Sequence, residues 1–426
     1  MSITSHYCDE MFELILACFL GIACGTFTGM IPGIHVNTAG AIMFASSTFL
    51  LIYVSPEFLC VLLVSMAISH ALLEFVPSML LGVPEEGTAL TVLPGHRMVL
   101  EGRSKEAIRI VAIGGFGAII ITIILLPIFM IVLPLFHEIS KPITWLILLV
   151  ISIYMIYRLS RGRKSFLWSL LLFIFSGILG EVVFQTPISS GLSLMAMFNG
   201  LFGISTILFS INDSSTIPNQ KSSYKFNFNT NTLKSIFAGG ISGAILGFLP
   251  GFGPAQGGVI AQELSGTSGE DDDTKSFLLA VSGLNTADCL FSLISLYLIG
   301  NPRSGIAVFM SYLIAECSFN HLIIFIFTSL IAVSISLILS IILGDRFSHF
   351  ISGINYKKLS YSVIILMVLI LYVFIIIYNA PFWYMTLILI TSTALGLLPH
   401  YLGTSKSHLM GVLIIPAIIN YFQMFH

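Results

Sequence analysis

Long apolar runs recur along the whole chain, and they limit the folds that it can adopt. A helix needs about 20 apolar residues to cross the hydrocarbon core of a bilayer, which is about 30 Å thick. Runs near that length occur at 11–32, 57–81, 108–136, 141–159, 165–184, 191–212, 231–250, 276–299, 320–343, 359–378, 381–398 and 407–424. These runs are continuous rather than alternating in polarity, so they predict helices and not a barrel. With 56% hydrophobic and 9% charged residues, we expect an all-α polytopic membrane protein of about 12–14 transmembrane or re-entrant helices.

One pattern occurs twice, at an offset of 218 residues. Residues 25–33 read GTFTGMIPG and residues 243–251 read GAILGFLPG. The same offset aligns glycines and prolines without a gap: Gly25 with Gly243, Gly29 with Gly247, Pro32 with Pro250, Gly33 with Gly251, Gly40 with Gly258, Gly82 with Gly300, Pro84 with Pro302 and Gly87 with Gly305. Duplicated Gly/Pro-interrupted segments are typical of transporters built from two repeats. We predict a first membrane repeat over 1–215, a cytoplasmic linker over 216–230 and a second membrane repeat over 231–426, with broken helices at the Pro-Gly motifs.

Basic residues gather on one predicted side of the membrane. Seven crossings per half place six loops together, and these loops or their flanks hold every Lys and Arg except Lys141 and Arg303. The six loops are 82–107, 157–164, 213–230, 265–275, 344–358 and 399–407. By the positive-inside tendency they face the cytoplasm of a multi-pass cell-membrane protein. An odd number of crossings per half inverts the second repeat relative to the first. If the segments after the Pro-Gly motifs only re-enter the membrane, each half has an even number of crossings and the repeats are parallel. The parallel arrangement fits the distribution of Lys and Arg less well.

Several other classes are disfavoured by the composition and by missing motifs. The six cysteines are scattered without CxxC or Cys/His spacing, so we expect neither a metal site nor a disulfide framework. The formal net charge of −2 provides no basic patch for nucleic acid. The spans contain no HExxH, GxSxG or paired-aspartate motif, so we expect no enzyme activity. The expected partners are a small anionic substrate and membrane lipids, and the expected cofactors are none apart from a coupling ion.

Polar residues follow both Pro-Gly motifs. A proline inside an apolar run ends the helical hydrogen-bond ladder, and the adjacent glycine lets the backbone approach a ligand. A helix that restarts after such a turn presents unpaired N–H groups to an anion. The substrate-binding residues predicted at these turns are Pro32, Gly33, His35, Asn37, Thr38, Pro250, Gly251, Gly253 and Gln256. The Gly-x-x-x-Gly spacings at 25–29 and 243–247 are better interpreted as close helix packing.

A second constellation lies in the apolar runs 57–81 and 276–299, one in each half. His70 and Glu74 are four residues apart and share a helix face. The offset aligns His70 with Asp288, so both halves carry an ionisable residue at the equivalent position. Ionisable residues are costly in lipid and usually mark an ion path. Asn285 and Thr286 add oxygen atoms that suit Na⁺. We predict ion coupling at His70, Glu74, Asn285, Thr286 and Asp288, with a purely structural hydrogen-bonded pair as the alternative.

The turns GVPEEG and GNPRSG are superimposed by the repeat and carry the remaining candidates. Arg303 is predicted to guide or clasp an anionic substrate, although a solvated turn is an equal alternative for Arg303, Glu85 and Glu86. Glu263 precedes a polar end of the short segment after the second Pro-Gly motif. It is interpreted as a surface or gate residue rather than a ligand.

The segment GVPEEGTALTVLPGHRMVLEGRSKEAIRIVAIGGF at 82–116 resembles the large membrane subunit of the tripartite tricarboxylate transporters (TctA-like), in a stand-alone archaeal-type form. The match includes Gly102, Arg103, Glu106 and Ala107, and NGLFGIS at 199–205 is similar to the end of that family's first half. The chain departs from the family pattern at IGNPRSG, 299–305. The resemblance implies an ion-coupled importer of carboxylates, served in bacteria by an external substrate-binding protein and a small membrane subunit.

The predicted function is therefore secondary active transport of a small organic anion, such as a di- or tricarboxylate, in symport with Na⁺ or H⁺. The two repeats would alternate access to a site at the Pro-Gly turns. A second hypothesis keeps the fold and changes the cargo: the same half-helices could hold the phosphate of a lipid carrier such as a polyprenyl phosphate and translocate it.

Overall fold

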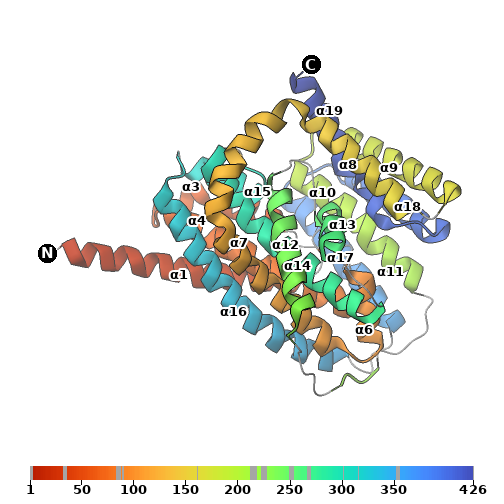
Figure 1. The fold of residues 1–426 in the computed structure, drawn as a ribbon, viewed down its shortest axis with the longest axis horizontal. Coiled ribbons are helices and arrows are strands. Elements are labelled where there is room, and N and C mark those ends of the chain that lie inside the picture. Colours follow the sequence, from red (N-terminus) through yellow and green to blue (C-terminus); the bar gives the residue numbers. More distant parts are fainter. Residues whose placement is uncertain are drawn as a thin grey trace.

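The computed structural model describes residues 3–31, 36–82, 88, 91–160, 162–211, 218–221, 228–248, 254–265, 270–300, 302–314, 316–351 and 356–425. All regular structure in these ranges is helical (Figure 1). The first half contains α1 (Ile3–Gly29), α2 (Val36–Ala45), α3 (Ser47–Leu50), α4 (Pro56–Leu73), α5 (Phe75–Leu81), α6 (Val92–Leu100), α7 (Ser104–Ser140), η1 (Lys141–Ile143), α8 (Thr144–Leu159), α9 (Arg163–Phe184), α10 (Ser190–Phe198), η2 (Asn199–Ile204) and α11 (Ser205–Ser210). The second half contains α12 (Thr230–Phe248), α13 (Pro254–Ser265), α14 (Glu270–Ile299), α15 (Gly305–Leu313), α16 (Phe319–Ile351), α17 (Tyr356–Ile377), α18 (Phe382–Leu402), η3 (Lys406–Met410) and α19 (Gly411–Phe425).

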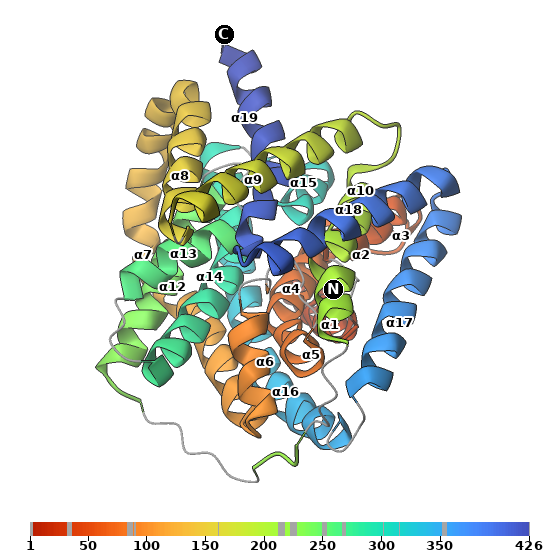
Figure 2. The same cartoon turned by 90° about the vertical axis from the view of Figure 1, so that its right-hand side faces the viewer.

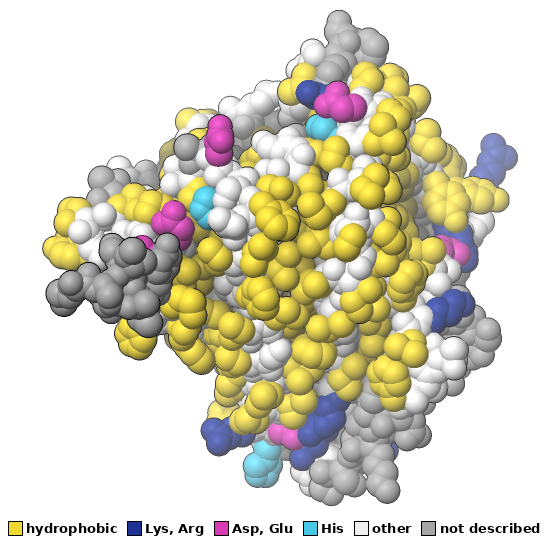
Figure 3. All heavy atoms as spheres, turned by 60° about the vertical axis from the view of Figure 1, so that its left-hand side comes forward, with side chains coloured by type: hydrophobic (Ala, Val, Ile, Leu, Met, Phe, Trp, Pro, Cys, Tyr) yellow, Lys and Arg dark blue, Asp and Glu magenta, His cyan; other side chains and the backbone are white. Residues whose placement is uncertain are grey.

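The helices have the lengths and composition of a membrane protein. Within the described ranges, ten helical stretches are long and apolar enough to cross a bilayer, and the longest combines α7 and α8. Figure 3 shows a broad hydrophobic face with basic side chains gathered at its lower edge. The predicted all-α polytopic membrane fold is thus confirmed. The helices that restart after the Pro-Gly motifs, α2 and α13, have 10 and 12 residues, fewer than the about 20 residues of a single straight spanning helix.

Two helical segments form the centre of the main bundle. The span Pro56–Leu81, which comprises α4 and α5, is buried over its whole apolar window, and α14 is buried over most of its own. A helix that is apolar on all sides is stable only when protein surrounds it or when it lies in lipid. Here α1, α7, α14 and α16 pack around α4, while α12 and α7 cover α14. His70, in the last turn of α4, and Glu74, which follows it, are therefore held inside protein.

Glycine contacts recur at the offset of 218 residues. A Cβ atom at Gly21 or Gly25 of α1 would overlap the carbonyl oxygen of Leu62 or Met66 on α4. In the second half, a Cβ atom at Gly239 would lie 2.6 Å from the Ala280 oxygen, and one at Gly243 would lie 3.0 Å from the Leu284 oxygen. Each pair in the second half is the first-half pair plus 218. Small residues that let backbones touch are the usual basis of helix association in membranes, and both halves use the same ones.

The long helices α7 and α16, which the offset makes equivalent, run in opposite directions (Figure 1). Arg109, near the start of α7, makes two hydrogen bonds of 2.9 and 2.8 Å with the Asp345 carboxylate, near the end of α16. At the same end, Lys275 of α14 lies 3.0 Å from Glu106 of α7. Three helix ends from both halves are thus tied together by ion pairs.

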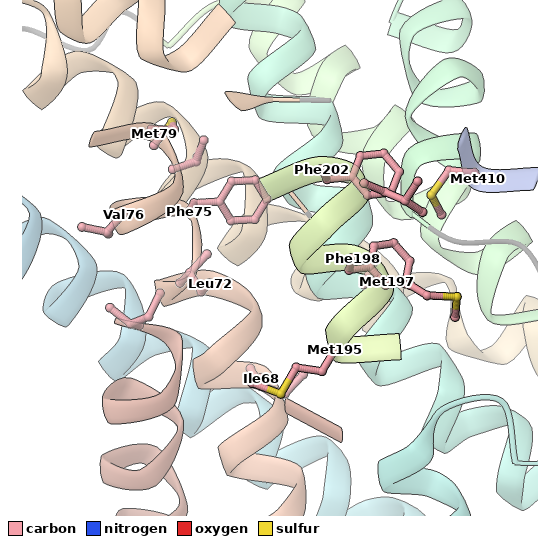
Figure 4. Close-up of a cluster of buried hydrophobic side chains, with 14 of the residues drawn as sticks. Ile68, Leu72, Phe75, Val76, Met79, Met195, Met197, Phe198, Phe202 and Met410 are labelled. Atoms are coloured by element: carbon pink, nitrogen blue, oxygen red, sulfur yellow. The ribbon is translucent and has the colours of Figure 1, made fainter. Parts of the chain in front are cut away.

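A second group of helices joins the later parts of the two halves. The first-half helix α9 packs on α19 of the second half, and α18 packs on η2 of the first half (Figure 2). Glycines again mark the contacts, because a Cβ at Gly180 would overlap Val412 and one at Gly396 would overlap Leu201. A buried cluster of Ile68, Phe75, Met195 and Phe202 connects this group to α4 and α5 (Figure 4).

We predict that Gly25→Ala destabilises the protein, because the added methyl group overlaps the Met66 carbonyl and must push α1 away from α4. Overpacking of this kind costs about 1–3 kcal/mol. Thermal unfolding in detergent, followed by tryptophan fluorescence, should show a lower midpoint. Phe27→Leu is the control, since Phe27 lies on the same helix with its side chain exposed. Equal midpoints for both variants would contradict tight α1–α4 packing.

Candidate functional site

A polar network lies at the centre of the main bundle, where α1, α4 and α14 meet. His70 and Glu74 stand one turn apart at the end of α4, and Glu74 is the residue at which α4 gives way to α5. Their side chains are 2% and 6% exposed. Ionisable groups buried at membrane depth are costly and require partners. The partners come from two other helices, one in each half.

Thr28 orients the imidazole of His70. Its Oγ1 lies 3.0 Å from His70 Nδ1 and also 3.0 Å from the Cys24 carbonyl oxygen of its own helix. A hydroxyl has one proton to donate, and the carbonyl can only accept it. Thr28 therefore accepts a hydrogen bond from Nδ1–H, an assignment that follows from the network. The other ring nitrogen, Nε2, faces Glu74 Oε2 at 3.5 Å.

Asn285 of α14 holds the carboxylate of Glu74 from the other side. Its Nδ2 donates to Glu74 Oε1 at 2.6 Å and to the Ala71 carbonyl oxygen at 3.1 Å. Both partners are acceptors, so the amide must present its NH₂ group to them. Hydrogen bonds to a charged group are stronger than neutral ones, and this bond joins a second-half helix to the ionisable residue of the first half.

This arrangement has room for one proton between Nε2 of His70 and Oε2 of Glu74. Without it, two lone pairs face each other and the site carries an uncompensated negative charge in a buried position, which is costly. With it, the pair is neutral overall. Hard cations instead need several converging oxygen ligands, whereas both oxygens of Glu74 face nitrogen atoms here.

The remaining residues of the predicted coupling set lie elsewhere on α14. The Thr286 hydroxyl donates to Ser282 of its own helix at 2.9 Å, and this side chain faces Gly115 of α7. Asp288 is partly exposed, and its backbone packs against Gly243 of α12. The structure thus brings His70, Glu74 and Asn285 together, and it directs Thr286 toward another helix.

Most of the predicted substrate residues lie outside the described residues. These are Pro32, Gly33, His35, Pro250, Gly251 and Gly253, together with the side chains of Thr38 and Gln256. Asn37, at the start of α2, is described. A Cβ atom at Gly305, the first residue of α15, would lie 2.7 Å from Asn37 Oδ1, so the helix after the first Pro-Gly motif meets the turn that carries Arg303.

The Arg303 turn is built on α14 and α19. Ser304 caps α15 by accepting a hydrogen bond from Ala307 N at 3.1 Å, and it receives another from Ser292 Oγ of α14 at 2.7 Å. Arg303 itself lies 3.4 Å from the Tyr421 hydroxyl. Glu263 of α13 forms an ion pair of 2.7 Å with Arg158 of α8, in keeping with a surface position. Glu85 and Glu86 fall outside the described residues.

Sequence reasoning missed one cation, Lys406, which served only as a topology signal. It stands at the start of η3 and donates hydrogen bonds to Ser205 Oγ at 3.0 Å and to the Phe202 carbonyl oxygen at 3.3 Å. The signal that could have identified it is a lysine between two apolar runs, in the stretch GTSKSHLM. The residue equivalent to Lys406 in the first half, 218 positions earlier, is Ile188.

A polytopic helical fold with ionisable residues buried in its centre is typical of membrane transporters. The chain belongs to the tripartite tricarboxylate transporter TctA family, whose model matches residues 15–411. The family resemblance read from the sequence is therefore confirmed, and the family is one of transporters rather than enzymes. Its members work in tripartite systems with an external binding protein and a small subunit.

Two curated proteins are similar to this chain. A protein of Methanocaldococcus jannaschii, described as uncharacterized protein MJ1079, is 31% identical over 414 residues, which covers 96% of this chain and 99% of the relative. An uncharacterized 52.8 kDa protein in the TAR-I ttuC' 3'region of Agrobacterium vitis is 25% identical over 261 residues, covering 56% of this chain and 50% of that protein. No solved structure matches the chain.

We predict that Asn285→Leu destabilises the protein, because it removes two hydrogen bonds and leaves the Glu74 carboxylate without its donor. Loss of a buried hydrogen-bond partner costs about 1–3 kcal/mol. The unfolding midpoint in detergent should fall. Thr286→Val is the matched control on the next residue, whose hydroxyl donates a hydrogen bond within its own helix. If Thr286→Val is as damaging as Asn285→Leu, the proposed role of Asn285 is wrong.

Proposed function

We propose that this protein is a secondary transporter of small organic anions, such as di- or tricarboxylates, coupled to a proton. The observation that carries the proposal is the buried network of His70, Glu74 and Asn285, which links the two halves. The membrane fold and the family support the class of membrane transporter, and the network supports the choice of the coupling ion. The geometry fits H⁺ better than Na⁺, because nitrogen atoms surround the carboxylate.

Coupling follows from electrostatics at the network. When the proton between His70 and Glu74 leaves, a negative charge remains inside the protein. That charge disfavours an anionic substrate nearby and raises the free energy of the buried site. The proton should therefore bind together with the substrate and leave when the site opens to the other side. Thr28 precedes the first Pro-Gly motif by four residues, so a shift of α1 would change the network directly.

We further propose an inverted relation between the two repeats, with the basic loops in the cytoplasm. The antiparallel course of α7 and α16 supports it, because parallel repeats would align these helices. The ion pairs that join Glu106 to Lys275 and Arg109 to Asp345 support it too, since they gather basic loops from both halves at one end. An external binding protein and a small membrane subunit remain part of the proposal for this chain.

We predict that purified protein in liposomes takes up labelled citrate when an inward proton gradient is imposed, and that Glu74→Gln abolishes this accumulation. The amide cannot release a proton, so the variant should still exchange citrate across the membrane without net uptake. Thr286→Val serves as a control with normal uptake. Accumulation driven by Na⁺ alone, at equal pH on both sides, would contradict proton coupling.

Testing several carboxylates keeps this experiment informative about the substrate. Malate, succinate and tartrate should be measured beside citrate under the same gradient. If none is transported by well-folded protein, a lipid phosphate becomes the better cargo hypothesis.

A further inference from the structure

The motif NGLFGI at 199–204 forms a π-helix, η2, between α10 and α11. Helices with this wider turn are rare and often occur at functional sites. All six residues are buried. Gly200 lies against the backbone of α18, where an added Cβ would come 2.8 Å from Thr393 N. Figure 4 shows Phe202 on this segment, near Met410 of η3, and Phe198 at the end of α10. The π-helix of the first half thus lies against two elements of the second.

Lys406 places its ε-amino group at this contact. Its ammonium group bonds to Ser205 Oγ at 3.0 Å, to the Phe202 carbonyl oxygen at 3.3 Å and to Thr206 Oγ1. All three partners are neutral, and among the described residues no carboxylate lies within ion-pair distance of Lys406. Half-buried cations normally have a counter-charge. A lysine that served only to fasten η3 to η2 would be more stable with an acidic partner.

Two further polar side chains lie on the two elements that Lys406 joins. His408 of η3 is 2% exposed and Asn199 of η2 is 6% exposed. Their Nε2 and Nδ2 atoms are buried without a hydrogen-bond partner among the described residues. Buried polar atoms are nearly always hydrogen-bonded. The two elements that Lys406 joins therefore carry a buried amide donor on Asn199 and an unpartnered imidazole nitrogen on His408, and an oxygen atom of a ligand would satisfy the Asn199 donor.

The position of η3 in the fold relates this contact to the Pro-Gly turns. η3 packs against α13, the half-helix after the second motif, and α10 packs against α2, the half-helix after the first. The starts of η3 and α10 are near-equivalent under the offset of 218 residues. We propose that Lys406, with Asn199, binds a carboxylate group of the transported anion. This inference rests on the proposed function and adds the cation that recognises the substrate.

The test compares Lys406→Gln and Lys406→Arg with Lys164→Gln, a matched control whose lysine is exposed at the start of α9. Uptake of labelled citrate into liposomes gives KM and the maximal rate. Losing a charge-assisted bond to the substrate should raise KM about tenfold or more in Lys406→Gln. Lys406→Arg should stay within a few-fold of wild type, because the charge remains, and Lys164→Gln should be unchanged. A KM for Lys406→Gln equal to that of wild type overturns the proposal.

A second measurement applies when Lys406→Gln does not fold or when citrate is not transported. Wild-type protein is treated with an amine-reactive ester, and modification of Lys406 is followed by mass spectrometry, with citrate, with inorganic phosphate or with neither. Protection of Lys406 by citrate, with Lys164 unprotected, supports the proposal even if uptake fails, in which case the transport function itself is wrong. Protection by phosphate alone overturns the carboxylate assignment. Absence of protection by either anion overturns the site.

Discussion

The burial of α4 on every side is the constraint on which the rest of the structure depends. A helix with neither a lipid face nor a water face must satisfy each of its polar groups from its neighbours. His70 and Glu74 meet this requirement only because α1 and α14 approach closely enough for Thr28 and Asn285 to reach them. The glycines of α1 permit that approach on one side. On the other, glycines of α7 let α14 pack closely, and α14 in turn carries Asn285 to the carboxylate.

The two halves share their packing and differ in their chemistry. Backbone contacts of α1 on α4 recur between α12 and α14 at the same spacing. The network itself does not recur: His70 is matched by Asp288, but Glu74 is replaced by Ser292 and Thr28 by Leu246 at the equivalent positions. Ser292 bonds to Ser304 and so fastens a turn. A second buried ion pair would add a second desolvation cost, and duplicating the scaffold does not require it.

Some features of the fold and of the site could be predicted because they are local in sequence. Apolar runs predict helices, and the spacing of His70 and Glu74 places them on one face of one helix. The pairing of Asn285 with Glu74 joins residues 211 positions apart, so it depends on how α14 packs against α4. Asn285 and Thr286 are adjacent in sequence, yet a helix turns about 100° per residue, and this rotation directs Asn285 to α4 and Thr286 to α7. The sequence gives this rotation between adjacent residues but not which neighbouring helix each side chain meets.

The sequence by itself determined the membrane class, the helical content, the duplicated glycine contacts and the family, because each follows from composition or from short-range spacing. Only the tertiary structure decided which polar residues share a site. It joined His70, Glu74 and Asn285 across the two halves, and it placed Lys406 against the π-helix without a carboxylate partner among the described residues. The physical reason is that the partner of a buried charge depends on how each helix is rotated about its axis and shifted along it relative to its neighbours. Both are set by packing between residues that are far apart in the sequence.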